Sequence, residues 1–400
     1  MRIKRYPMSK IVNFIKQETV LSIAAILAMV SAIVIKPDQQ YLNYIDFRTL
    51  AILFCLMAIM NGFQKIGVFD FAARGLIKHA GNVTALMLLL VLLCFFSSML
   101  ITNDVALITF VPLTIITFEK MYPENTANQK NRQHENQDIF VIGTVILQTM
   151  AANLGSMLTP LGNPQNLYLY GISGMGFRQF LMLMLPYSAA SLVLITVAVL
   201  LFKLYRNERC ETAITVDDRF LWNRERKILC ACYGLLFLLS LLTVLHVLSY
   251  PVLFVIVLVS LLVLDSLFGR NVIRTTDLSL IFTFIFLFVF IGNMGRVGVF
   301  RDFLESFIEG REVISAVIAS QVMSNVPAAI LLSGFTEDVN ALVIGTNLGG
   351  LGTLIASMAS LISFKYIARW NKKMRGKYFL GFTVMNLIFL AFLLVLYHLL

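Results

Sequence analysis

The 400-residue chain is poor in charge, because Asp, Glu, Lys and Arg make up only 14% of it. A soluble protein is roughly 25% charged, so this composition excludes a chain whose whole surface faces water. Cysteine and histidine are scarce, and the five cysteines show neither metal-site nor disulfide spacing. The sequence has no HExxH, P-loop or GxGxxG-after-strand pattern, which argues against a metalloprotease, an ATP-driven pump and a dinucleotide enzyme.

Long uncharged runs recur from one end of the chain to the other. A helix needs about 20 apolar residues to cross a hydrocarbon core of roughly 30 Å, and several runs are long enough. The sequence therefore predicts an all-α polytopic membrane protein. Runs without any Asp, Glu, Lys or Arg are Thr49–Gln64, Ile139–Phe177, Phe180–Phe202, Ile228–Leu264 and Tyr378–Leu400.

We expect about nine spans, two of them broken, and two re-entrant hairpins that enter and leave on one side of the membrane. The hairpins are 83–118 and 313–335, and the broken spans are 139–170 and 339–364. A hairpin made of two short full spans would keep the same loops on the same sides. The complete set of expected spans is 20–35, 49–64, 139–170, 179–202, 228–246, 250–265, 278–294, 339–364 and 379–398.

Basic residues gather in segments that this arrangement places on one side. With the N-terminus inside, cytoplasmic segments hold 26 of the 32 Lys and Arg residues, with clusters in 1–19, 203–227 and 365–377. Short cytoplasmic loops of membrane proteins carry such an excess. The net charge of +10 therefore predicts anchoring in a lipid bilayer rather than nucleic-acid binding, with the N-terminus in and the C-terminus out.

Three short matches, in the same order, predict an internal repeat. Segment 65–69 matches 296–300, Asn103 matches Asn325, and 153–155 matches 347–349. The expected topology puts the first pair of segments on opposite sides, so the halves are inverted, as in many secondary transporters. The predicted organisation is a basic N-terminus 1–19, a first repeat 20–202, a cytoplasmic loop 203–227, and an extra span with the second repeat in 228–400.

Polar residues interrupt the apolar pattern at the hairpin tips and within 153–166 and 345–360. Unwound backbone at membrane depth is tolerated where it is buried in protein or lines a wet cavity. Its carbonyls suit a cation such as Na⁺, and nearby helix N-termini suit an anion. The alternative for Asn103 and Asn325 is that they are N-caps of the second hairpin arms, with Pro327 in a tolerated first-turn position.

Asp104 is the one acidic residue that this arrangement leaves inside the membrane. A carboxylate near the bilayer centre costs roughly 2.5–3.5 kcal/mol on insertion scales. Neither hairpin and neither interruption contains Lys or Arg, so a local salt-bridge partner is missing. We expect Asp104 to bind a cation or a proton; the alternative is a structural cap that faces an aqueous vestibule.

The Asn-Asp hairpin tip and the Gly- and Pro-containing interruption at 153–166 resemble the ion-transporter superfamily of divalent anion:sodium symporters, arsenite permeases and NhaD-type Na⁺/H⁺ antiporters. The tip is most similar to the arsenite-permease/NhaD branch, whereas 356–358 departs from the symporter pattern. The resemblance implies cation-binding positions at Ser98, Asn103, Asp104, Gly155, Asn325 and Gly349. It also implies substrate-binding positions at Thr102, Thr159, Asn163, Ser324 and Thr353.

These features predict an ion-coupled secondary active transporter, not an enzyme, that moves a small carboxylate, oxyanion or arsenite-like anion by alternating access. Na⁺ or H⁺ would be the coupling ion, with Na⁺ at the cation positions and no other cofactor. The resemblance implies a bacterial-type cytoplasmic membrane and a homodimer. The alternatives are a Na⁺/H⁺ antiporter, an ion channel, or an intramembrane hydrolase at Ser173, with His246 near the outer surface beside it as the base.

Overall fold

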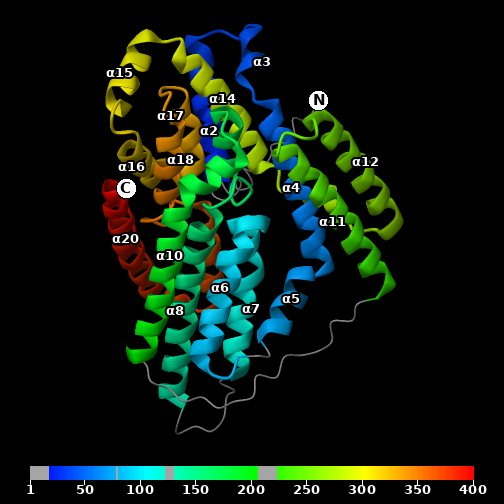
Figure 1. Cartoon of the computed structure of the whole chain (residues 1–400), viewed down its shortest axis with the longest axis vertical. Helices are drawn as coiled ribbons and strands as arrows, with labels where there is room; N and C mark the ends of the chain where they lie inside the picture. The colour runs from blue at the N-terminus through cyan, green and yellow to red at the C-terminus, as the bar shows by residue number, and fades with distance from the viewer. Residues whose placement is uncertain (1–17, 78–79, 122–129, 206–222) are drawn as a thin grey trace, which may run out of the picture.

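A computed structural model describes residues 18–77, 80–121, 130–205 and 223–400, and within these ranges the chain forms helices and no strands (Figure 1). The first ten helices, in chain order, are α2 (Thr19–Val34), α3 (Gln40–Tyr44), α4 (Phe47–Ile66), α5 (Val68–Ile77), α6 (Val83–Ile101), α7 (Asn103–Met121), α8 (Lys130–Ser156), α9 (Pro164–Ser173), α10 (Phe177–Tyr205) and α11 (Arg224–Val244). The others are α12 (Tyr250–Phe268), α13 (Val272–Thr275), α14 (Ser279–Gly295), α15 (Gly298–Ile308), α16 (Glu312–Met323), α17 (Asn325–Ser333), α18 (Val339–Leu348), α19 (Met358–Trp370), the 3-10 helix η1 (Lys372–Met374) and α20 (Arg375–Leu399).

Seven helices of the described residues are long and apolar enough to cross a membrane. An eighth crossing results if α14 and α15, which meet at 102°, are counted as one bent span. The predicted multi-pass, all-helical class is confirmed. The seven helices are α4, α6, the part of α8 from Gln137 to Ser156, α10, α11, α12, and η1 together with α20.

Several predicted spans are shorter or more interrupted than a simple crossing. Helix α2 has 16 residues, and the interruption predicted in 339–364 separates α18, with 10 residues, from α19, with 13 residues. The two arms of the second expected hairpin, α16 and α17, have 12 and 9 residues. Helix α6 has 19 residues, which is enough for a full span, so re-entrance of the first hairpin stays a prediction.

The described helices pack in two groups. The scaffold group contains α2, α3, α4 and α11–α14: α14 packs along α2, and α4 packs against α11 and α12. The core group contains α6–α10 and α16–α20, with α8 packed against α6, α7, α10, α19 and α20. In Figure 1, α11 and α12 lie at the right and α6, α8, α10 and α20 at the left. The groups meet where α4 packs on α9 and α14 packs on α17.

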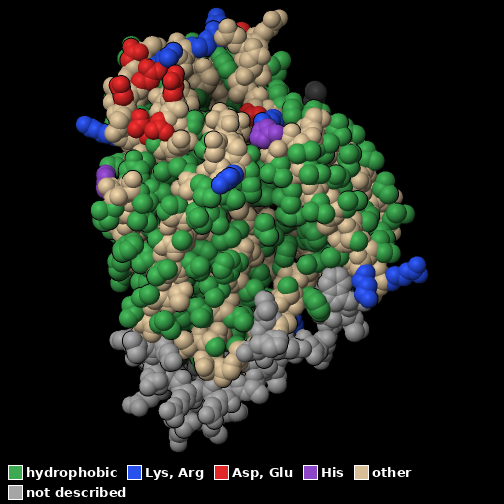
Figure 2. All heavy atoms as spheres, viewed as in Figure 1, with side chains coloured by type: hydrophobic (Ala, Val, Ile, Leu, Met, Phe, Trp, Pro, Cys, Tyr) green, Lys and Arg blue, Asp and Glu red, His purple; other side chains and the backbone are tan. Residues whose placement is uncertain are grey.

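Apolar side chains cover the outside of the molecule. Val255 on α12, Val193 on α10 and Phe392 on α20 are all more than half exposed, and the space-filling view shows a continuous apolar surface around the middle (Figure 2). A water-facing surface of this kind would aggregate. These faces therefore belong in contact with lipid.

The C-terminal ends of α2 and α14 are joined to each other and to α3 by polar and aromatic contacts. The Asn293 amide nitrogen donates to Ser31 Oγ at 3.0 Å and to Tyr41 Oη at 2.8 Å. Arg296 forms an ion pair with Asp38 at 2.7 Å, and its hydrogen bond holds the pKa of the Asp38 carboxyl below the usual value. One turn before Arg296, the Tyr44 ring covers Gly292.

Gly292 gives a direct test of this packing. A Cβ at Gly292 would lie 2.3 Å from Tyr44 Cγ, whereas a Cβ at Gly295 would meet nothing within 4 Å. We expect Gly292→Ala to lower stability by about 1–3 kcal/mol, the usual cost of overpacking. We expect Gly295→Ala to be neutral or to stabilise by up to about 1 kcal/mol through helix propensity. Thermal unfolding in detergent measures both, and equal melting temperatures would contradict this packing.

Candidate functional site

Each expected hairpin turns on one residue with an unusual backbone. Thr102, between α6 and α7, has φ 71° and ψ 152°. Ser324, between α16 and α17, has φ 76° and ψ 153°. A positive φ is uncommon for residues other than glycine, and the same combination occurs at matching positions of both tips. The two tips, 102–103 and 324–325, therefore share one backbone geometry.

Each tip is held by the backbone of one helix interruption. We call residues 157–163, between α8 and α9, break 1, and residues 349–357, between α18 and α19, break 2. The Asn103 N–H donates to the Gly162 carbonyl at 3.0 Å, and the Asn325 N–H donates to the Ala356 carbonyl at 2.9 Å. These bonds satisfy polar groups that lie away from water, and they fix each tip to its break.

The two breaks correspond position by position, and their threonines make the same kind of contact. Segment 153–166 aligns with 347–360, which share Asn-Leu-Gly at the start and a threonine four residues after the glycine. Thr159 Oγ1 donates to the Met99 carbonyl, and Thr353 Oγ1 donates to the Gln321 carbonyl at 3.5 Å. Each threonine therefore joins its break to the last turn of the preceding hairpin arm.

Two buried asparagines, Asn153 and Asn347, connect the breaks to each other; we call them the crossed amides. Asn153 Oδ1 accepts from Ser357 Oγ at the start of α19, at 3.0 Å. Asn347 Oδ1 accepts from Asn163 Nδ2 at the start of α9, at 3.1 Å. Each crossed amide thus lies in the first half-helix of one interruption and bonds to the second half-helix of the other.

Further bonds make this crossing continuous with the first tip. Asn103 Nδ2 donates to Asn153 Oδ1 at 3.0 Å, so that oxygen accepts from both a tip and the opposite half-helix. Asn347 Nδ2 donates to Asn166 Oδ1 at 2.6 Å, and Asn153 Nδ2 donates to Ser360 Oγ at 3.4 Å. Because these side chains are buried, the loss of one partner leaves a polar atom without compensation.

Glycine is required where each hairpin arm approaches its interrupted helix. A Cβ at Gly155 would lie 2.0 Å from the Phe95 carbonyl oxygen and 2.8 Å from Ser98 Oγ. A Cβ at Gly349 would lie 2.6 Å from Ser320 Oγ. Ser98 and Ser320 each stand five residues before a tip asparagine, so the close approach is the same in both places.

The predicted cation positions of the first half come together around this approach. Ser98 lies against Gly155, and Asn103 joins the tip to α8 through Asn153. Asp104 follows Asn103 in the first turn of α7 and is partly exposed. Among the described residues, the ion pairs involve other acids, and Asp104 interacts electrostatically with Asp277, just before α14.

The remaining predicted positions also lie at tips or breaks. Thr102 and Ser324 are the turning residues, Thr159 and Thr353 anchor the breaks, and Asn163 caps α9 by accepting from the Asn166 N–H at 2.9 Å. The two cation positions of the second half, Asn325 and Gly349, are both buried, at tip 2 and at the start of break 2.

Two residues of this region, Ser357 and Gln321, were not predicted from the sequence. The alternative in which the tip asparagines are N-caps was also wrong for Asn325. Aligning the breaks position by position would have matched Ser357 with Asn163, and Ser357, in the segment that departs from the symporter pattern, donates a hydrogen bond to Asn153. Gln321 carried no sequence signal. The second arms begin at Asn103 and Asn325 themselves, so the cap position of α17 belongs to Ser324, which makes no side-chain cap bond.

Paired tips and helix interruptions inside a multi-pass helical protein are typical of membrane transporters. The sequence model of the citrate transporter family matches residues 11–341. The chain belongs to that family, and the predicted ion-transporter superfamily is confirmed.

Relatives along most of the chain have transporter or membrane-protein names. An uncharacterized transporter of Methanocaldococcus jannaschii is 32% identical over 86% of this chain and 87% of its own length. The inner membrane protein YbiR of Escherichia coli is 29% identical over 80% of both chains. An uncharacterized transporter of Mycobacterium tuberculosis is 21% identical over 80% of this chain and 77% of its own.

Gly155→Ala tests the close approach at the first tip. The added methyl would collide with backbone at Phe95, so α6 and α8 must separate, and we expect a loss of about 1–3 kcal/mol or more. Gly234→Ala on α11, where nothing lies within 4 Å, is the matched control. Thermal unfolding and folded yield in detergent measure the effect. A Gly155→Ala protein as stable as the control would show that this contact is wrong.

Proposed function

We propose that the protein is an ion-coupled secondary active transporter that carries a small anion across a bacterial-type cytoplasmic membrane by alternating access. The observation that carries this proposal is the pair of matching tip-and-break sites joined by the crossed amides Asn153 and Asn347. A pathway that opens first to one side and then to the other needs two related arrangements. Two copies of one structural unit can exchange those arrangements.

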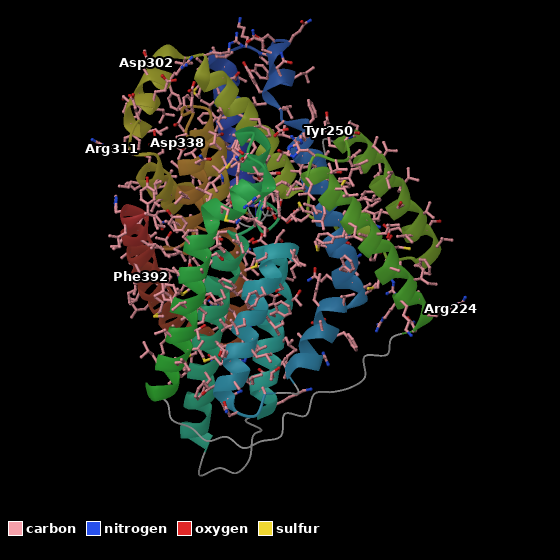
Figure 3. All side chains as sticks on the ribbon, viewed as in Figure 1. Arg224, Tyr250, Asp302, Arg311, Asp338 and Phe392 are labelled. Carbon is pink, nitrogen blue, oxygen red and sulfur yellow. The ribbon has the colours of Figure 1, made fainter. Side chains whose placement is uncertain are left out.

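The two halves are inverted copies in this proposal, with the N-terminus in and the C-terminus out. The distribution of charge supports it. Acidic side chains gather at one end of the molecule over α15 and α16 (Figure 2). Asp302 and Asp338 lie toward this end, whereas Arg224, which begins α11, lies far from it (Figure 3). The excess of Lys and Arg in the segments placed inside, 26 of 32, follows the positive-inside rule.

The coupling cation binds at the first tip, near Ser98, Asn103, Asp104 and Gly155. Asp104 supplies the only carboxylate that the predicted topology leaves in the membrane. Carbonyl and amide oxygens of the tip and break add neutral oxygen ligands, which hard cations prefer. Because no Lys or Arg lies in either hairpin or break, a bound cation also supplies the positive charge that an anion needs nearby.

The substrate lies between the two tips and the two breaks, near Thr102, Thr159, Asn163, Ser324 and Thr353. Hydroxyl and amide donors there, with the N-terminal ends of α7, α9, α17 and α19, suit carboxylate oxygens. The family name, citrate transporter, supports a carboxylate substrate. In the transport cycle the core group moves against the scaffold group, across the contacts of α9 with α4 and of α17 with α14.

A Na⁺/H⁺ antiporter of the same fold is the second candidate, favoured by the electrostatic repulsion between Asp104 and Asp277. Two acids that repel each other bind a proton or a small cation more readily than an anion. Uptake of labelled citrate into proteoliposomes under a Na⁺ or H⁺ gradient distinguishes the two functions. Antiport gives dye-detected proton movement on Na⁺ addition and no citrate uptake.

Asp104→Asn tests the cation site. Removing the charge while keeping the shape should lower gradient-driven uptake at least about tenfold, which corresponds to a loss of 1.4 kcal/mol. Asp302→Asn, an exposed acid on α15, should leave uptake unchanged. Full coupled uptake by Asp104→Asn would overturn the assignment of that residue. Single-channel currents in place of saturable uptake would overturn the carrier.

A further inference from the structure

The core group packs on the scaffold group through one helix from each half of the chain. Helix α4 packs on α9, and α14 packs on α17. The internal repeat matches α4 with α14, α7 with α17 and α9 with α19, so the corresponding pairs are α14 with α19 and α4 with α7. Among the described residues, neither of these two pairs packs closely. The repeated halves therefore differ in how they meet the scaffold.

The exposure of matching side chains shows the same difference. Leu161 in break 1 is 4% exposed, whereas its counterpart in break 2, Ile355, is 54% exposed. Val326 after the second tip is buried, whereas Asp104 after the first tip is partly exposed. The scaffold thus covers the second tip and the first break. Helices α7 and α19, which follow the open tip and the open break, end in segments that the proposed topology places in the cytoplasm.

Tyr168 on α9 lies at the covered contact between the two groups. Its ring centroid is 5.5 Å from that of Phe288 and 6.3 Å from that of Phe284, both on α14 of the scaffold. Its hydroxyl shares a hydrogen bond of 2.9 Å with Ser333 Oγ, at the end of α17. One tyrosine therefore joins both covered helices of the core group to one helix of the scaffold group.

The matching positions on the open side carry aliphatic side chains. Ile362 on α19 corresponds to Tyr168 by the match of 153–155 with 347–349, and Met57 on α4 corresponds to Phe288 by the match of 65–69 with 296–300. Both side chains are partly exposed. Paired aromatic rings attract each other beyond the area they bury, a gain that isoleucine and methionine lack. The contact on the covered side is therefore the stronger of the two.

We propose that Tyr168, Phe284 and Phe288 form the outer gate of the transport pathway, and that the protein at rest holds this gate closed and is open to the cytoplasm. The inference rests on the proposed function. When two inverted halves exchange their arrangements, α4 packs on α7 and α14 packs on α19. Ile362 then meets Met57, and this weaker contact closes the cytoplasmic side while the outer gate is open.

Two cysteine pairs test the exchange, in a chain whose five native cysteines are replaced by alanine. Ile291→Cys with Gly334→Cys should cross-link rapidly in the resting protein, because a Cβ at Gly334 would lie 2.8 Å from Ile291 Cγ2. Met57→Cys with Ile362→Cys should cross-link slowly, only while the outer gate is open. Each disulfide, quantified by mass spectrometry, should stop citrate uptake into proteoliposomes, and reduction should restore it.

Phe288→Leu tests the gate itself, because leucine fills much of the same space without an aromatic ring. This change should raise the cross-linking rate of the Met57 and Ile362 cysteines at least about threefold, the population shift expected from the loss of one aromatic pair. Phe282→Leu, on the same helix at a side chain that is 49% exposed, is the matched control and should leave the rate unchanged.

The inference is overturned if the cysteines at 57 and 362 never cross-link, if they cross-link as fast as the outer pair in the resting protein, or if Phe288→Leu and Phe282→Leu give equal rates. Full uptake by the protein cross-linked at 291 and 334 would also overturn it. In each of these cases the reduced proteins still take up citrate, so the proposed function stands. Failure of the proposed function removes citrate uptake from the wild type as well, whatever the cross-linking rates.

Discussion

The structure depends on the satisfaction of polar groups where two helices are interrupted inside a membrane protein. Hydrocarbon offers no hydrogen bonds, so every freed N–H and carbonyl must find a partner within the protein or in a wet cavity. The crossed amides Asn153 and Asn347 meet this need by bonding to the opposite half-helix. Each break is therefore hydrogen-bonded to the helix before the other break, and the two sites form one connected network.

These cross-connections give the two sites a common framework. The backbone N–H groups of Asn103 and Asn325 are bonded to carbonyls of their breaks. Gly155 and Gly349 let the interrupted helices lie so close to α6 and α16 that a side chain at either position would collide. The chemistry of the two tips differs, because Asp104 follows the first tip asparagine whereas Val326 follows the second. A symmetrical framework thus supports an asymmetrical pair of sites.

Much of this arrangement could be predicted from the sequence. Hydrophobic runs predicted the long helices. The matches of Asn103 with Asn325 and of 153–155 with 347–349 predicted the tips and breaks, because interruptions need small and polar residues. The partners of those residues could not be predicted. Ser357 bonds to Asn153 across 204 positions of the chain. Gln321 donates to carbonyls of break 2, and only the packing of α16 against that break brings these atoms together. Helix lengths alone also leave the number of crossings open, since α6 is long enough to span and α17 is not.

The central claim is that a cation at the first tip and a substrate between the two breaks share the unit formed by the crossed amides. An experimental structure determined with Na⁺ and citrate tests it most directly. The account predicts ion density beside Asn103, Asp104 and Gly155, and citrate density between Thr159 and Thr353. Citrate bound within the scaffold group, away from both breaks, would contradict it.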